Sequence, residues 1–114
     1  MIPKYVPIVK AKQGEFDAYN HLEDISKKKM LPLFELPKFT QTTNERVAYK
    51  DKANPIECYL CDLTNNISSA RGSLPTMVDI FTWSPNSTLE NGEHILNFSV
   101  NRLVQLGVPV IPVI

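Results

Sequence analysis

The chain has 114 residues, of which 43% are hydrophobic, and its 12 basic and 12 acidic side chains give a formal net charge of zero. This composition predicts one globular domain with a modest core. A balanced charge provides no overall field to hold a nucleic-acid backbone or an anionic membrane, so neither is expected as the main partner. The longest apolar run, residues 108–114, is too short to span a membrane. The N-terminus has no apolar secretory core, and with two cysteines the expected compartment is a reducing cytoplasm.

The first half of the chain alternates short apolar runs with a helical pattern. Residues 5–9, rich in Val, Ile and Tyr, predict a first strand. Apolar side chains then recur at helical spacing, and acidic residues near the start and lysines at the end suit the dipole of one helix over residues 14–29. Residues 30–36 predict a second strand. Residues 38–53 are polar and aperiodic, and predict a long loop at the C-terminal end of that strand.

Residues 54–71 show the clearest helical pattern. Asn54 is a suitable N-cap, Pro55 fits the first helical position, and Glu57 falls three residues after the cap. Gly72 and a following proline end the helix. The apolar residues of this segment share one face of the helix: Ile56, Tyr59, Leu60, Leu63, Ile67 and Ala70.

The second half repeats the alternation. Residues 76–83 predict a third strand, residues 89–106 a helix that Gly107 ends, and residues 108–114 a fourth strand. Right-handed crossovers place these strands in chain order in one parallel sheet. The predicted fold class is α/β, with four parallel strands alternating with three helices in a single repeat domain over residues 1–114, as in half of a (βα)8 barrel. No helix follows the fourth strand, so we expect either a longer protein or a surface covered by another chain.

Four segments of the sequence resemble the N-terminal part of the beta-protein family of satellite phages and prophages. They read YVPIVKAKQGEFDAYNHL, LPLFELPK, MVDIF and GVPVIPVI. The resemblance implies a (βα)-barrel-like fold in longer members of the family. It also implies a genetic role beside a toxic or phage-excluding neighbour whose killing the beta protein counters. Members of the family are generally longer than this chain.

Charged residues fall where the predicted strands end. Lys10 and Lys12 lie where the first strand meets its helix, Glu35 and Lys38 lie at the equivalent end of the second strand, and Asp79 lies within the third. Polar groups at the C-terminal ends of barrel strands converge on one mouth. A lysine there is a candidate base, Schiff-base amine or anion clamp, and the alternative is a structural ion-pair network. Asp79, which has apolar neighbours, is expected to pair with Lys10 or Lys12.

The remaining reactive residue types predict no separate site. Cys58 and Cys61 form a C-x-x-C pair, but His21 and His94 lack ligand spacing for zinc, and a redox pair normally begins a helix directly after a strand. Plain thiols and solvated or locally hydrogen-bonded histidines are therefore expected. The sequence contains no P-loop, dinucleotide fingerprint or nucleophile elbow, and we expect no cofactor and no metal.

Two functions remain open. The preferred hypothesis is a protein that acts by protein–protein contact in a toxin-neutralising or phage-exclusion module. Its expected partner is a neighbouring toxin-like gene product, and a homodimer is the other possible assembly. The alternative is a partial barrel enzyme, or its remnant, that uses lysine and carboxylate chemistry. An enzyme predicts a closed mouth where Lys10, Glu35 and Asp79 converge, whereas a binding module predicts an exposed apolar patch or an open sheet edge.

Overall fold

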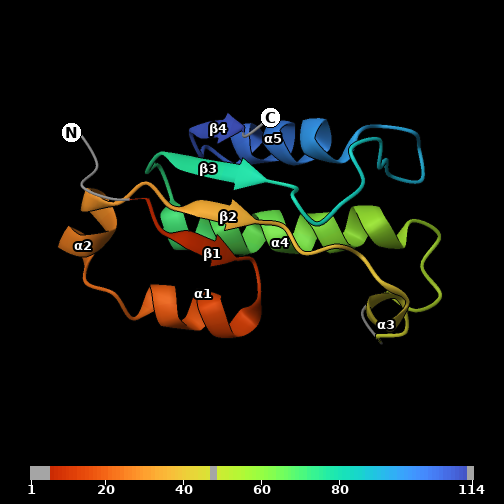
Figure 1. Cartoon of the computed structure of the whole chain (residues 1–114), viewed down its shortest axis with the longest axis horizontal. Helices are drawn as coiled ribbons and strands as arrows, with labels where there is room; N and C mark the ends of the chain where they lie inside the picture. The colour runs from red at the N-terminus through yellow and green to blue at the C-terminus, as the bar shows by residue number, and fades with distance from the viewer. Residues whose placement is uncertain (1–5, 47–48, 113–114) are drawn as a thin grey trace.

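The computed structural model describes residues 6–46 and 49–112. Its strands are β1 (Ile8–Lys10), β2 (Leu33–Glu35), β3 (Thr76–Asp79) and β4 (Val110–Pro112). They form one four-stranded sheet in the order β1-β2-β3-β4, and every neighbouring pair is parallel (Figure 1). The predicted α/β class, with four parallel strands in chain order, is confirmed.

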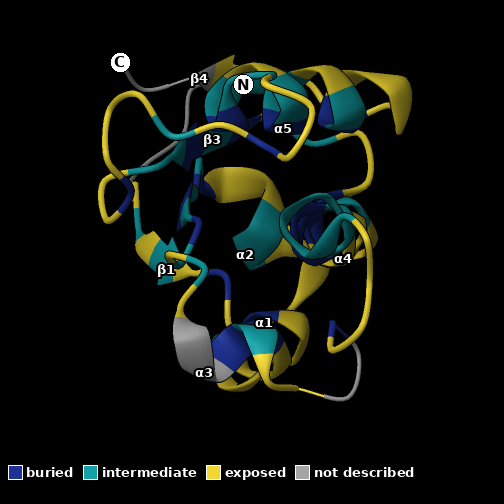
Figure 2. Ribbon diagram, turned by 90° about the vertical axis from the view of Figure 1, so that its right-hand side faces the viewer, coloured by how far each residue is buried: buried dark blue, intermediate teal, exposed yellow. Residues whose placement is uncertain are grey.

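Helices connect each strand to the next. α1 (Gln13–Asn20) and α2 (Asp24–Lys29) join β1 to β2, α3 (Gln41–Asn44) and α4 (Pro55–Arg71) join β2 to β3, and α5 (Ile95–Gln105) joins β3 to β4. α1 packs against α4, and α4 packs against α5. These three helices lie on one side of the sheet, and the opposite face carries no helix in the described part of the chain (Figures 1 and 2). Sequential parallel strands with a one-sided helix layer are compatible with half of a (βα)8 barrel.

The core lies between the sheet and this helix layer. Phe34 of β2 and Val78 of β3 are fully buried, as are Leu60 and Ile67 of α4 and Leu103 of α5, and all belong to one cluster of buried side chains. Full burial of an apolar side chain of this size stabilises the fold by roughly 1.5–3 kcal/mol. The side chains that alternate with the buried ones in each strand therefore point to the face without helices.

The prediction of one continuous helix over residues 14–29 is wrong. The helix divides into α1 and α2, and Glu23 between them adopts an extended conformation with φ −68° and ψ 151°. Leu22 and Ile25 continue the apolar spacing, yet they are 39% and 63% exposed. Because these two side chains contribute little burial, packing does not favour a continuous helix across the break.

The predicted start of the last helix is also wrong. α5 begins at Ile95, because the preceding residues form a turn in which the Leu89 N–H donates to the Glu93 carbonyl at 2.8 Å. His94 is the N-cap, and its Nδ1 accepts a hydrogen bond from the Leu96 N–H at 3.1 Å. A local cap thus determines where the helix starts.

Strand lengths differ from the predictions as well. Each described strand has only three or four residues, as in β2 (3 residues) and β3 (4 residues). The predicted strand positions 5, 113 and 114 lie outside the described residues. The predicted loop 38–53 contains the short helix α3.

Candidate functional site

Three of the predicted site residues form one row across the sheet. The register places Lys10 beside Glu35, and Glu35 beside Asp79. Lys10 is exposed, whereas both carboxylates are half-buried. All three are the last residues of their strands and lie on the face without helices. The structure therefore brings these candidates together at the C-terminal end of the sheet.

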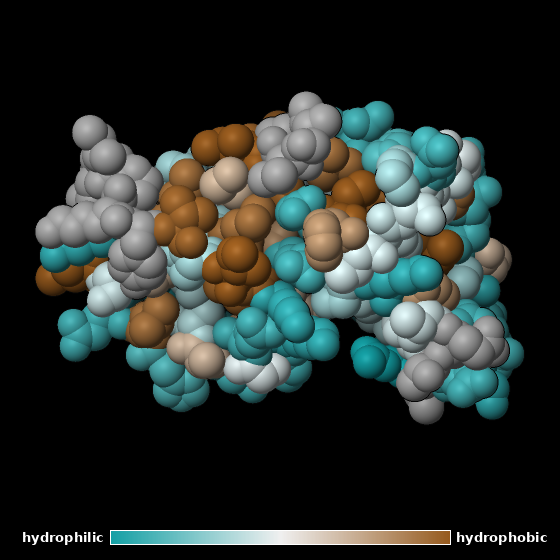
Figure 3. All heavy atoms as spheres, in the orientation of Figure 1, coloured by the Kyte–Doolittle hydropathy of each residue, from teal (hydrophilic) through white to brown (hydrophobic). Residues whose placement is uncertain are grey.

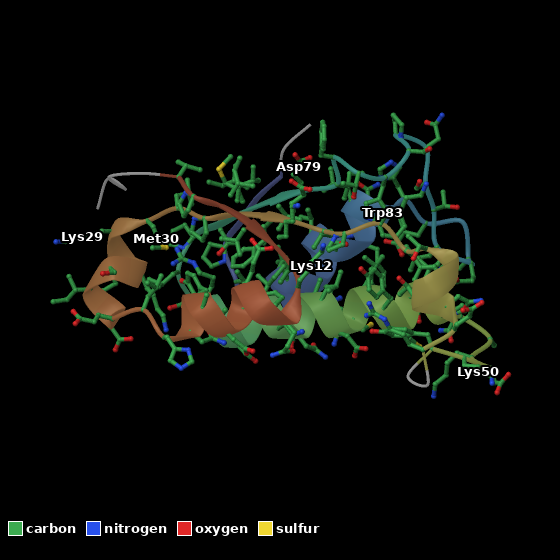
Figure 4. All side chains as sticks on the ribbon, turned by 60° about the horizontal axis from the view of Figure 1, so that its bottom comes forward. Lys12, Lys29, Met30, Lys50, Asp79 and Trp83 are labelled. Atoms are coloured by element: carbon green, nitrogen blue, oxygen red, sulfur yellow. The ribbon has the colours of Figure 1, made fainter. Side chains whose placement is uncertain are left out.

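The expected ion pair of Asp79 with Lys10 or Lys12 is not formed. Within residues 6–46 and 49–112, the Asp79 side chain makes no ion pair or hydrogen bond, and its backbone carbonyl accepts from the Leu36 N–H at 2.9 Å. Lys12 is the N-cap of α1 and lies away from Asp79 (Figure 4). The prediction is wrong because Asp79 is only half-buried, so water can solvate its carboxylate in place of a cation.

Lys12 belongs to a second feature, a cavity beyond the C-terminal ends of β1 and β2. This cavity has a volume of about 790 Å³, and Lys12, Lys38 and Arg46 contribute cationic side chains to its lining. A smaller hollow of about 230 Å³ is lined by Lys10 and Glu35 as well as by Lys12 and Lys38. Lys12 and Lys38 thus lie between the charged row and the larger cavity.

Two buried tyrosines form one wall of the larger cavity. Tyr49 and Tyr59 are 7% and 6% exposed, and their rings meet edge-to-face with centroids 5.6 Å apart. The Tyr49 hydroxyl donates to Asp62 Oδ2 at 2.7 Å, and the Tyr59 hydroxyl donates to the Pro37 carbonyl at 3.0 Å. Burial raises the pKa of both phenols, and for Tyr49 the hydrogen bond to Asp62 raises the pKa further.

Arg46 and Tyr49 were missed by sequence reasoning, because they lie in the aperiodic segment 38–53. The available signal was positional: a long loop at the C-terminal end of a strand commonly carries function. Lys12 and Lys38 were found by a related argument, since each lies near the C-terminal end of a predicted strand.

The family model described as Beta protein matches residues 5–114. The chain belongs to the Beta protein family. This result confirms the resemblance seen in the sequence and makes the chain a phage-associated protein. No curated protein and no solved structure matches the chain. Among the described helices, none has the length and apolar character needed to cross a membrane.

The two histidines of this Beta protein family member form hydrogen bonds with nearby backbone groups, as predicted. His21 Nδ1 donates to the Asp17 carbonyl at 2.6 Å. His94 Nε2 donates to the Pro85 carbonyl at 2.7 Å, so its Nδ1 is the acceptor at the α5 cap. Both rings therefore have structural roles in turns and helix ends.

The C-x-x-C cysteines lie on α4 and are both half-buried free thiols. Cys58 Sγ contacts Asn54 Oδ1 at 3.8 Å, and burial raises the pKa of the Cys61 thiol. A raised thiol pKa is the opposite of the shift found in reactive cysteines. In the part of the chain that the structure describes, no group of three or more His, Cys, Asp or Glu side chains is placed to hold a metal ion.

The N-terminus of α4 is capped differently from the prediction. The Asn54 side chain donates to Glu57 Oε2 at 2.9 Å and makes no cap hydrogen bond. Instead, the carboxylate of Glu90 accepts from the Ile56 N–H at 2.9 Å and from the Glu57 N–H at 3.2 Å. Glu90 lies 34 residues after Ile56, so local spacing could not reveal this cap.

Proposed function

We propose that this Beta protein family member acts by protein–protein contact in a phage or prophage module that neutralises a toxin or excludes other phages. Its family supports the phage association. The observation that supports a contact mechanism is the sheet face that carries no helix in residues 6–46 and 49–112, which combines an apolar row with a charged row.

The apolar row consists of Ile8, Leu33, Met77 and Ile111, which lie side by side in the sheet register. Ile8 is 66% exposed and Ile111 is 47% exposed, whereas the central two are half-buried. Hydrophobic side chains gather over the middle of this face (Figure 3). Parallel sheets are normally covered on both faces, and a contiguous exposed apolar patch marks an interaction site.

The charged row makes this surface asymmetric, because it lies at the C-terminal ends of the strands. Lys10, Glu35 and Asp79 lie beside the apolar row, and the two carboxylates outnumber the lysine. Phe81, two residues beyond the end of β3, is 77% exposed. A complementary partner therefore presents apolar side chains next to a basic group, since matched charges set the register of an interface.

The enzyme alternative has less support from the same geometry. Acid–base or Schiff-base chemistry with Lys10, Glu35 and Asp79 requires these groups to converge in a closed, water-excluding mouth. In residues 6–46 and 49–112 they form a row on the sheet face that carries no described helix, and Lys10 is exposed. An open apolar face is the feature that the binding hypothesis predicts.

The proposal is tested by co-expressing the chain with the toxin-like product of the neighbouring gene and measuring both copurification and cell survival. Ile8→Asp and Ile111→Asp place a charge on the apolar row, and should abolish copurification and protection while the melting temperature stays near that of the parent. Val104→Asp is the matched control, because Val104 is 58% exposed on α5, on the helix side.

Retained protection in the Ile8→Asp and Ile111→Asp variants would overturn the role of this face. A parent chain that neither binds nor counteracts the neighbour would overturn the proposed function. Sedimentation of the parent chain tests one further outcome, a homodimer in which each copy covers the apolar row of the other. In that case Ile8→Asp and Ile111→Asp should each yield monomers.

A further inference from the structure

The cavity beyond β1 and β2 is separate from the proposed contact face, because it lies against α4 on the helix side. Residues from three segments line it: Lys12 and Gln13 after β1, Lys38 after β2, and Asn66 on α4. Its volume of about 790 Å³ falls within the range of sites that hold small molecules.

The lining of this cavity is locally cationic in a chain with no net charge. Lys12, Lys38 and Arg46 line it, and among its described lining residues the single acidic one is Asp62, whose Oδ2 already accepts from the Tyr49 hydroxyl. Within the described ranges, the side-chain nitrogens of the three cations make no hydrogen bond or ion pair. Three cations that have no ion-pair partner among the described residues, all lining one cavity, generate a positive potential that an anion would neutralise.

The start of α1 adds to this potential. Lys12 is the N-cap, has an extended backbone and provides no side-chain cap, and Gln13 at the first helical position lines the cavity. Uncapped N–H groups and the positive end of the helix dipole favour a bound anion. The acidic residue of this first turn, Glu15, lines a different hollow, and its Oε1 accepts from the Lys10 N–H at 3.0 Å.

Buried and hydrogen-bonded side chains form another part of the cavity wall. Tyr49 and Tyr59 are held by hydrogen bonds from their hydroxyls, and Thr43 beside them is only 5% exposed. The exposed amides of Asn65 and Asn66 supply further donors along α4. The buried tyrosine wall therefore loses little conformational entropy when a ligand enters.

We propose that this cavity binds a small phosphate-bearing molecule, with Lys12, Lys38 and Arg46 contacting the phosphate oxygens. Three cations that line one cavity, together with a helix N-terminus, suit a multiply charged phosphate group better than a single carboxylate. The cavity also has room for more than a bare ion, which points to a phosphorylated small molecule.

Inorganic pyrophosphate is the probe for this site, used at constant ionic strength with chloride as the reference anion. Titration followed by calorimetry and by amide NMR shifts should show saturable binding, with shifts centred on Gln13, Lys38 and Asn66. Lys12→Gln and Arg46→Gln should each weaken binding by about tenfold, the effect expected for one charge-assisted contact.

Lys29→Gln is the matched control, since it removes the same charge from an exposed residue of α2 at the far end of the molecule (Figure 4). It should leave the affinity unchanged, as should Ile111→Asp on the contact face. The absence of saturable binding at millimolar pyrophosphate would overturn the proposal. An equal weakening by Lys12→Gln and Lys29→Gln would also overturn it, because that result indicates non-specific attraction.

Discussion

Arg71 at the end of α4 donates a hydrogen bond of 2.8 Å from Nη1 to the hydroxyl of Tyr19, which lies 52 residues earlier in α1. Arg71 is only 3% exposed. Its guanidinium also donates to the carbonyls of Lys27 and Met30 at 2.8 and 3.2 Å, and to Thr76 Oγ1 at 3.2 Å. One side chain therefore connects α1, α2, the entry to β2 and the start of β3.

Arg71→Met should lower the free energy of unfolding by at least about 2 kcal/mol, because it leaves several buried acceptors without a donor. Arg71→Lys should recover only part of the loss, since an ammonium lacks the planar fork of five N–H donors. Urea denaturation measures both. Arg102→Met is the control, as the Nη2 atom of Arg102 makes an exposed contact to Asn65. Equal stability of the Arg71 and Arg102 variants would contradict this role.

The Arg71 network illustrates what the sequence does not contain. A basic residue in the last turn of a helix is expected from the dipole alone, so the sequence does not distinguish Arg71 from any other such residue. Its acceptors are backbone carbonyls and hydroxyls from separate elements, and no residue pattern marks them. By contrast, α4 and the strand order were predictable, because helical spacing and right-handed crossovers depend on local sequence and chain chirality.

The candidate site was predictable in a similarly partial way. The position of Lys10, Glu35 and Asp79 at strand ends was sufficient to place them together, since parallel strands end at the same edge of a sheet. That these three side chains form no ion pair within the described ranges was not predictable, because it depends on how much water reaches each carboxylate. Arg46 joins Lys12 at the cavity only through the path of an aperiodic segment.

Glu90→Ala should destabilise the protein by about 1 kcal/mol, the usual cost of removing an N-terminal helix cap. Its carboxylate accepts from two N–H groups in the first turn of α4, which would otherwise lose their acceptor. Glu90→Gln should cost less, since one amide oxygen remains to accept a hydrogen bond. Thermal and urea unfolding measure the difference.

Glu93→Ala serves as the control for the Glu90 variants, because it removes a carboxylate from the same connection between β3 and α5 without touching α4's cap. A Glu93 variant as unstable as the Glu90 variant would show that the charge of this connection matters, and not the cap.

The free energy of unfolding should fall at alkaline pH because of the ionisation of Tyr49 and Tyr59. Burial raises the pKa of both phenols above the ordinary value near 10, so above about pH 10 the unfolded chain loses protons that the folded chain retains. Their contribution is therefore complete below about pH 10 and is lost as the pH rises. Tyr49→Phe and Tyr59→Phe should each flatten this decline. Tyrosinate absorbance, followed with urea unfolding across the pH range, tests the sign.

Asp79→Asn should leave the melting temperature nearly unchanged, with a free-energy change within about 0.5 kcal/mol. The Asp79 carboxylate is half-buried and makes no ion pair within the described part of the chain, so the substitution breaks no buried charge pair. The hydrogen bond from the Leu36 N–H uses the backbone carbonyl of residue 79 and survives any side-chain change. A loss of about 3–5 kcal/mol would instead indicate a buried pair with a cation. If the charged row orients the partner, Asp79→Asn should weaken binding to the neighbouring gene product although the variant folds normally. Measuring binding together with thermal unfolding separates a role of Asp79 in partner binding from a role in stability.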